Sequence, residues 1–183
     1  MVQRLYLDAN IFVHCGLKRL DEDKARRSKK LLKQIAEGKY EGVASLLCLT
    51  EICEVIRGLA VEVFNIHSAK DWREMIEETV RFVFQNKNIK IIENNPNERI
   101  GTARIKDLLY YSIAEEAHKL IKNYEGKTVK EQDGFRHKGV GCIDCFHLAL
   151  AKRIGCDMIA TFDRDFEETK GEIEPFIVQD RIW

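Results

Sequence analysis

The sequence predicts an α/β sandwich with a mostly parallel sheet. Short apolar runs that look like buried parallel strands recur along the chain, and segments with helical periodicity lie between them. Strands that alternate with helices are typical of parallel sheets. The 183 residues are 45% hydrophobic, which is enough for one domain with a substantial core. We therefore expect a single domain over residues 1–183.

The strands and helices are expected in alternation along the chain. Strands are expected at residues 5–7, 42–44, 89–92, 158–160 and 176–178. Helices are expected at residues 24–37, 46–64, 69–84, 102–124 and 143–154. Residues 65–138 are expected to form an insertion in which two of these helices flank the third strand. Its last part, residues 124–138, is the most polar stretch and is expected to be a solvated connection, with a mobile flap as the alternative.

Two acidic residues follow predicted strands. Asp8 closes the first apolar run, and Asp163 comes shortly after the run at residues 158–160. In open α/β sheets the ligand crevice forms beyond the carboxyl ends of the strands, so both side chains are placed to reach it. Either residue alone is also typical of a helix N-cap or a turn. The two together indicate a functional site.

Two further acids lie on predicted helices near the same edge. Glu51 borders the apolar stripe of the helix at residues 46–64, whereas Glu54 points to nearly the opposite side. Asp144 opens the helix at residues 143–154, and its carboxylate is expected to face packed structure. A buried carboxylate needs a cation or several hydrogen-bond donors to offset its desolvation. A metal ion is one explanation, and capping of the residue's own helix is the other.

Four carboxylates at one edge would repel one another unless a divalent cation neutralised them. Carboxylate oxygens suit hard ions such as Mg²⁺ or Mn²⁺, which proteins commonly share with substrate phosphates. Such a site can polarise a phosphoryl oxygen, generate hydroxide from bound water and align an in-line displacement. The predicted chemistry is phosphodiester hydrolysis, with these candidate catalytic residues and metal ligands: Asp8, Glu51, Asp144 and Asp163.

The residues around these acids resemble a known family. The resemblance is carried by the segments LYLDANIFV, ASLLCLTEICEVIRGL and VGCIDCFHLALAKRIGCDMIATFDRDF, which occur in the order and spacing of a PIN domain, the nuclease fold of VapC-type toxins. Their acids are Asp8, Glu51, Asp144 and, in a closing T-x-D, Asp163. The resemblance implies a three-layer α/β/α sandwich whose parallel sheet has about five strands and helices on both faces.

The resemblance also implies an activity and a wider set of site residues. It implies an endoribonuclease that depends on Mg²⁺ or Mn²⁺ and leaves a 5′-phosphate and a 3′-hydroxyl. Asn10 and Thr161 would lie near the acids as hydrogen-bonding support. Asp165 is a candidate additional metal ligand, and capping of the following turn is its alternative role. Residues 65–138 do not match the compact toxins, so the toxin role stays open.

Composition and charge limit which partners and which cellular location we expect. Thirty basic residues balance thirty acidic ones, so the net charge does not by itself indicate nucleic acid. Acids gathered around a metal would leave the remaining surface slightly basic and able to attract a phosphate backbone. Because Arg4 and Asp8 interrupt the apolar start of the chain, we expect neither a secretory signal nor a membrane span, and a cytoplasmic protein. RNA is the expected partner, joined in the toxin case by a cognate antitoxin and a second copy in a homodimer.

Three features have simpler explanations. Cys142 and Cys145 form a CxxC without a second pair at zinc-like spacing, so most of the six cysteines are expected to be reduced, buried and inert. His147 could reach the acids, but a lone histidine on an apolar helix is usually a core residue, and we assign it no catalytic role. Basic residues are concentrated at residues 18–33, where a solvated helix face is the default interpretation. RNA-backbone contact is the alternative, and residues 136–138 could extend it.

Three other functions compete with the ribonuclease toxin. The first is an RNA-processing PIN nuclease without an antitoxin. The second is a phosphatase of the haloacid-dehalogenase kind, which needs a second aspartate two residues after the first. That position holds Asn10, so this hypothesis is weak. The third is a non-catalytic PIN-like scaffold that binds RNA or protein, and the presence of all four acids argues against it.

Overall fold

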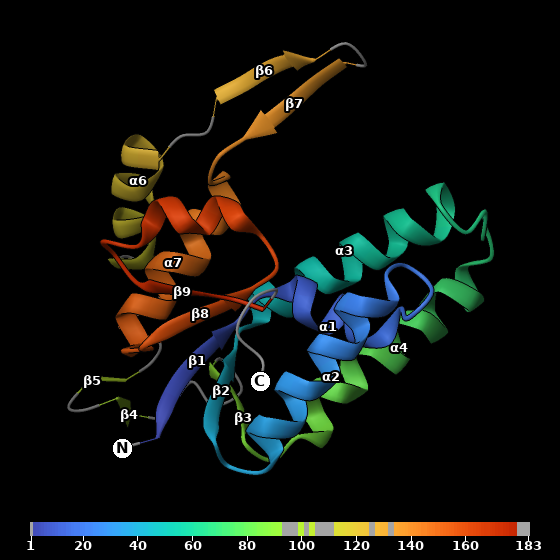
Figure 1. Ribbon diagram of the computed structural model, residues 1–183, viewed down its shortest axis with the longest axis horizontal. Coiled ribbons are helices and arrows are strands. Elements are labelled where there is room, and N and C mark those ends of the chain that lie inside the picture. Colours follow the sequence, from blue (N-terminus) through green and yellow to red (C-terminus); the bar gives the residue numbers. More distant parts are fainter. Residues whose placement is uncertain are drawn as a thin grey trace.

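A parallel sheet of five strands forms the centre of the computed structural model, with helices on both of its faces (Figure 1). The structure describes residues 2–92, 99–100, 103–104, 112–124, 127–131 and 134–178. The strand order is β3-β2-β1-β8-β9, and every pairing is parallel. The strands are β1 (Gln3–Leu7), β2 (Tyr40–Ala44), β3 (Ile89–Ile91), β8 (Met158–Thr161) and β9 (Glu174–Ile177). The predicted fold class is confirmed.

The central strand β1 is covered on both faces. Side chains alternate between the two faces of a strand, and a strand that is buried on both sides is a continuous apolar run. Leu5 and Leu7 accordingly pack into one hydrophobic core, and Tyr6 between them packs into the other. The two cores lie on opposite faces of the sheet.

Four helices cover the first face: α1 (Ala9–Gly16), α2 (Glu22–Ala36), α3 (Leu46–Glu62) and α4 (Ala69–Gln85). Three of them begin at a side-chain cap that accepts a hydrogen bond from a first-turn amide. The capping residues are Asp21 for α2, Ser45 for α3 and Ser68 for α4. Helix α1 packs against the other three helices of this layer.

The second face carries α6 (Ser112–Tyr124), α7 (Cys142–Ile154) and the short 3₁₀ helix η2 (Arg164–Thr169). Helix α7 is buried along much of its length and packs against α6. It ends at Gly155, whose φ of 73° is the left-handed conformation that commonly terminates helices. The ammonium group of Lys152 joins the layer by ion pairs to Glu116 and Glu172. Among the helices that the structure describes, none is both long and apolar enough to cross a bilayer.

The central part of the chain differs from the prediction in two places. The helix expected at residues 102–124 begins only at Ser112, and Ala103–Arg104 instead form strand β5, paired with β4 (Arg99–Ile100). Residue 102 and residues 105–111 of that prediction lie outside the described residues. The connection expected at residues 124–138 contains an antiparallel hairpin of β6 (Lys127–Glu131) and β7 (Gly134–Lys138). Polarity was misleading here, because a mostly polar strand shows no regular apolar alternation in its sequence.

Parts of the predicted insertion, residues 65–138, belong to the main layers. Strand β3 pairs with β2 at the edge of the central sheet, and α4 packs against α1 and α3. The strand order reverses between β1 and β8, because β2 and β3 follow on one side of β1 whereas β8 and β9 lie on the other. Ligands of open α/β sheets bind at such a switch point, beyond the carboxyl ends of the strands.

Candidate metal centre

Asp8 follows β1 directly, at the switch point, and only 5% of it is exposed. It occupies the N-cap position of α1, yet its side chain makes no capping hydrogen bond. Instead, its Oδ2 atom accepts hydrogen bonds from Asn10 Nδ2 and from Thr161 Oγ1, both at 2.6 Å. Neither bond uses Oδ1. The carboxylate is therefore held in place by neighbouring side chains and not by the helix that it precedes.

Thr161, the last residue of β8, joins the ends of the two central strands. Its hydroxyl donates to Asp8 and accepts from Asn10 Nδ2 and from the Asp163 amide, both at 2.9 Å. A hydroxyl group has one proton and two lone pairs, so these three bonds use its full capacity. Asn10 Oδ1 in turn accepts from the Phe162 amide at 3.2 Å. This network fixes Asp8 beside the loop that carries Asp163, and it contains both residues predicted as hydrogen-bonding support.

Glu51 lies in the second turn of α3 and is turned toward the sheet. Its side chain is 26% exposed, and its Oε2 atom lies 2.8 Å from His147 Nε2 on α7. Glu54 has a 63% exposed side chain and pairs with Arg57 at 2.6 Å. The two glutamates therefore point in different directions, as the helical spacing predicts.

The remaining predicted acids also hold local hydrogen bonds. Asp144 Oδ2 accepts from the Gly141 amide at 2.8 Å, which is the reciprocal half of a capping box at the start of α7. Asp163 caps η2 by accepting from the Asp165 amide at 2.9 Å. Asp165 Oδ2 accepts from the Gly139 amide at 2.8 Å. Capping and metal binding are compatible for Asp144 and Asp163, because each carboxylate has a second oxygen atom.

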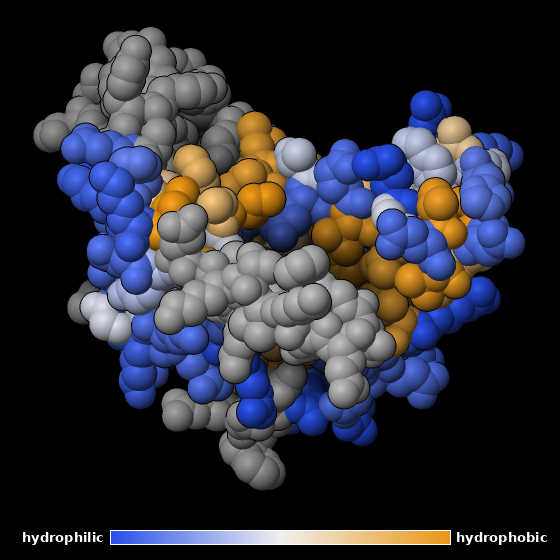
Figure 2. All heavy atoms as spheres, turned by 90° about the horizontal axis from the view of Figure 1, so that it is seen from above, coloured by the Kyte–Doolittle hydropathy of each residue, from blue (hydrophilic) through white to orange (hydrophobic). Residues whose placement is uncertain are grey.

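A cleft of about 270 Å³ brings the four predicted acids together. Asp165 is not among the residues that line it. Seen from above, the molecule has a hydrophilic hollow with hydrophobic surface on both sides (Figure 2). The lining of the cleft has the same mixed character, and its residues are Asp8, Ala9, Asn10, Val13, His14, Leu20, Glu51, Val55, Leu59, Asp144 and Asp163.

The cleft is electrostatically unfavourable for carboxylates in the absence of a cation. Burial raises the pKa of Asp8 to about 6, and the charges of Glu51 and Asp144 act in the same direction, although His147 and the bond from Thr161 oppose the rise. Burial also raises the pKa of Asp144, more than its bond from the Gly141 amide lowers it. The acids are thus crowded and poorly solvated, which a bound cation would offset.

The family of the chain follows from comparison with known proteins. A family model of the PIN domain matches residues 5–172. The chain belongs to the PIN domain family. The resemblance found in the sequence segments is thereby confirmed, and the coarse class of activity with it, since PIN domains are nucleases.

The fold of this PIN domain is shared with a solved structure. The match is to a chain of the crystal structure of VapBC2 from Rickettsia felis bound to a DNA fragment from their promoter. The TM-score is 0.54 at 13% sequence identity, and the match covers 93% of this chain and 96% of that chain. Identity this low makes the likeness one of fold. A search among curated proteins found no match.

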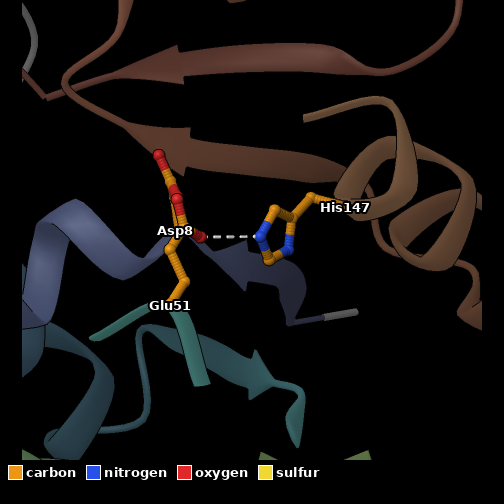
Figure 3. Close-up of side chains that lie close together, drawn as sticks. All are labelled: Asp8, Glu51 and His147. Atoms are coloured by element: carbon orange, nitrogen blue, oxygen red, sulfur yellow. Dashed lines mark hydrogen bonds and ion pairs between the residues drawn. The ribbon is translucent and has the colours of Figure 1, made fainter. Parts of the chain in front are cut away.

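His147 is a residue of the site to which the sequence analysis assigned no function. It is fully buried, as expected for a core histidine, but its ring joins the acids: Asp8, Glu51 and His147 each offer an atom within 4.8 Å of the others (Figure 3). Its other nitrogen, Nδ1, lies 2.7 Å from the Tyr6 hydroxyl. The signal in the sequence was its position three residues after Asp144, which places both side chains on neighbouring parts of one helix face.

The cysteines differ in part from the expectation that most of them are buried, because only Cys15, Cys48 and Cys145 are buried. All six thiols are free, and Cys142 is exposed whereas Cys145 is buried, with a pKa that burial raises to about 11. In the basic segment, Asp23 pairs with Arg26 and with Arg27. These contacts indicate a structural role for Cys145 and a partly neutralised face on α2.

Proposed function

We propose that this PIN domain is a metal-dependent endoribonuclease, which hydrolyses RNA phosphodiester bonds with Mg²⁺ or Mn²⁺. The observation that carries the proposal is the lining of one cleft by four carboxylates at the switch point of the sheet. The donor set consists of hard oxygen atoms, which fit Mg²⁺ and Mn²⁺ better than soft metals. The proposed ligands are Asp8, Glu51, Asp144 and Asp163.

The acids near the cleft differ in burial and in their hydrogen bonds, and these differences suggest different parts in the centre. When bound, the metal would polarise a phosphoryl oxygen and lower the pKa of a bound water molecule. Asp8 is the most buried acid, and the bonds from Asn10 and Thr161 leave its Oδ1 atom available. Asp163 is exposed and lines the cleft. Asp165, whose Oδ2 atom is held by the Gly139 amide, supports the loop after β8 in this proposal.

A basic residue next to the acids supports a nucleic-acid substrate. The Lys24 ammonium group lies 5.7 Å from the centre of the Phe162 ring, immediately beside Asp163 in the chain. A cation at this distance from an aromatic face is held near the site, where it can attract a phosphate. RNA as the substrate rests on the resemblance to PIN ribonucleases, and the cytoplasmic location rests on the charged residues in the apolar start of the chain.

The toxin of a toxin–antitoxin pair is the more specific form of this proposal. The solved relative comes from a VapBC2 complex, and the cleft of this chain has an apolar side that includes Val55, which is 39% exposed. Exposed apolar surface beside a charged site favours a protein partner that covers it. The partners would be a cognate antitoxin and a second copy in a homodimer. An RNA-processing enzyme without an antitoxin is the alternative.

Cleavage of labelled RNA tests the proposed function. Native protein is incubated with single-stranded and structured RNA, and with DNA of the same sequence, in Mn²⁺, Mg²⁺ or EDTA. We expect metal-dependent internal cuts in RNA that end in a 3′-hydroxyl, absent with Asp144→Asn and retained with the surface variant Glu54→Gln. Folded native protein that binds Mn²⁺ but cuts no RNA would contradict the ribonuclease proposal and favour a binding scaffold.

A further inference from the structure

A chain of buried hydrogen bonds begins and ends on α3. Ser45, the N-cap of α3, accepts from the Cys48 amide at 3.1 Å, and its hydroxyl lies 2.7 Å from the Tyr6 hydroxyl on β1. The Tyr6 hydroxyl lies 2.7 Å from His147 Nδ1 on α7, and His147 Nε2 lies 2.8 Å from Glu51 Oε2. The chain therefore links the start of α3, the central strand and the second helical layer to one carboxylate of the cleft.

One assignment of protons satisfies every member of this chain. The Ser45 hydroxyl, which already accepts from an amide, donates to Tyr6, and Tyr6 donates to His147 Nδ1. His147 then carries its proton on Nε2 and donates it to Glu51. Ser45, Tyr6 and His147 are all fully buried. A buried polar network with all its partners satisfied is rigid and specifies one arrangement.

His147 approaches Glu51 from the core and not from the cleft. The cleft is lined by the four acids but not by His147, whose exposure is zero. Both ring nitrogens have hydrogen-bond partners. Figure 3 shows the imidazole on α7 facing the carboxylate of Glu51, which comes from α3. This geometry is typical of a group that does not bind the metal itself but orients a side chain that does.

We propose that His147, held in orientation by Tyr6 and Ser45, is the positioning residue that fixes the Glu51 carboxylate for metal binding. This inference rests on the metal centre of the proposed function. A glutamate side chain on a helix surface loses rotamer freedom when it is fixed, and the bond from His147 fixes it before the metal arrives. Loss of such an outer partner typically lowers metal affinity about 10–100-fold.

Two substitutions of similar size separate positioning from packing. His147→Gln places an amide nitrogen near the position of Nε2 and can still donate to Glu51. His147→Asn places its amide near Nδ1, so it reaches Tyr6 but not Glu51. Both variants are neutral, but asparagine is one methylene shorter and leaves the larger cavity, so a purely structural role predicts that Mn²⁺ affinity falls only as far as stability does.

Mn²⁺ binding to RNA-free protein, followed by electron paramagnetic resonance, is the measurement, with urea unfolding to compare stability. We expect His147→Asn to lower Mn²⁺ affinity about 10–100-fold, His147→Gln to recover most of that loss, and Tyr6→Phe to lie between them. The surface variant His118→Asn is the matched control. Equal affinities for the Gln and Asn variants would overturn the positioning role.

Two other outcomes can be distinguished from equal Mn²⁺ affinities of the two His147 variants. Nitrogen hyperfine coupling to Mn²⁺ in the native protein, lost in both His147 variants, would make the imidazole a metal ligand and overturn the inference while supporting the metal centre. Native protein that stays folded and binds no Mn²⁺ would overturn the proposed metal centre itself, and the inference with it.

Discussion

Replacing Asp8 by asparagine should stabilise the metal-free protein at neutral pH and abolish its metal binding. Burial is the main reason that the pKa of this carboxyl rises from the ordinary 3.8 to about 6. At pH 7.5 the native fold must therefore hold an ionised carboxylate in a site that favours the protonated form. Asparagine carries no charge, and its side-chain oxygen can still accept from Asn10 and Thr161. Active sites commonly trade stability for function in this way.

The size and the pH range of the effect follow from the pKa. A rise from 3.8 to about 6, at about 1.4 kcal/mol per pH unit, corresponds to about 3 kcal/mol. The stabilising contribution of protonated Asp8 is fully present below pH 3.8 and is lost as the pH rises through about 6. The advantage of Asp8→Asn should thus be largest above pH 6 and fall by about half at pH 5. In a chain of this size, 3 kcal/mol corresponds to a Tm increase of roughly 6–12 °C.

Urea unfolding in EDTA at pH 7.5 and at pH 5 measures this difference, with Glu54→Gln as the surface control. Saturating Mn²⁺ should then raise the Tm of the native protein but not that of Asp8→Asn, because only the native centre binds the metal. The reasoning is refuted if Asp8→Asn is no more stable than the native protein in EDTA at pH 7.5. A stability difference that is the same at both pH values would also refute it.

Substitutions of Thr161, Asp165 and Glu51 test separate parts of the centre. Thr161→Val removes the donor to Asp8 and should lower Mn²⁺ affinity in calorimetry about 10–100-fold, whereas Thr161→Ser should restore it; equal loss in both would point to packing. Asp165→Asn should leave Mn²⁺ affinity almost unchanged, because Asp165 holds the Gly139 amide and does not line the cleft; a large loss would make it a ligand. Glu51→Gln should abolish RNA cleavage in a gel assay and Glu54→Gln should not, and the reverse result would contradict the orientation of α3.

The sheet and the positions of the acids were predictable because both depend on short stretches of sequence. Buried parallel strands are apolar runs, and their carboxyl ends meet at one edge of the sheet. Asp8 and Asp163 therefore had to fall near each other once β1 and β8 were neighbours. Helical spacing alone predicted that the side chains of Glu51 and Glu54 point in different directions. The catalytic and ligand roles of these acids stay predictions, as do the boundaries of the domain.

The elements that the sequence did not predict have weak local signals. Helix α1 follows β1 after a single residue, so strand and helix merge into one apolar stretch that is interrupted by Asp8 and Asn10. The sequences of β6 and β7 are mostly polar, so they lack the alternation that marks a half-buried strand.

The sequence placed His147 within reach of the acids but could not show its role, for a different reason. Its partners Tyr6 and Glu51 lie 141 and 96 residues away in the chain. Such contacts arise only when β1, α3 and α7 pack together. A buried histidine that merely fills the core and one that holds a carboxylate have the same sequence pattern.

The position of a bound metal tests the central claim most directly. Crystals of the native protein soaked in Mn²⁺ are measured at a wavelength where manganese scatters anomalously. We expect an anomalous peak in the cleft, within coordination distance of Asp8 and of at least one of Glu51, Asp144 and Asp163. An empty cleft at saturating Mn²⁺, or a peak only elsewhere on the protein, would contradict the proposal that these four acids form a metal centre.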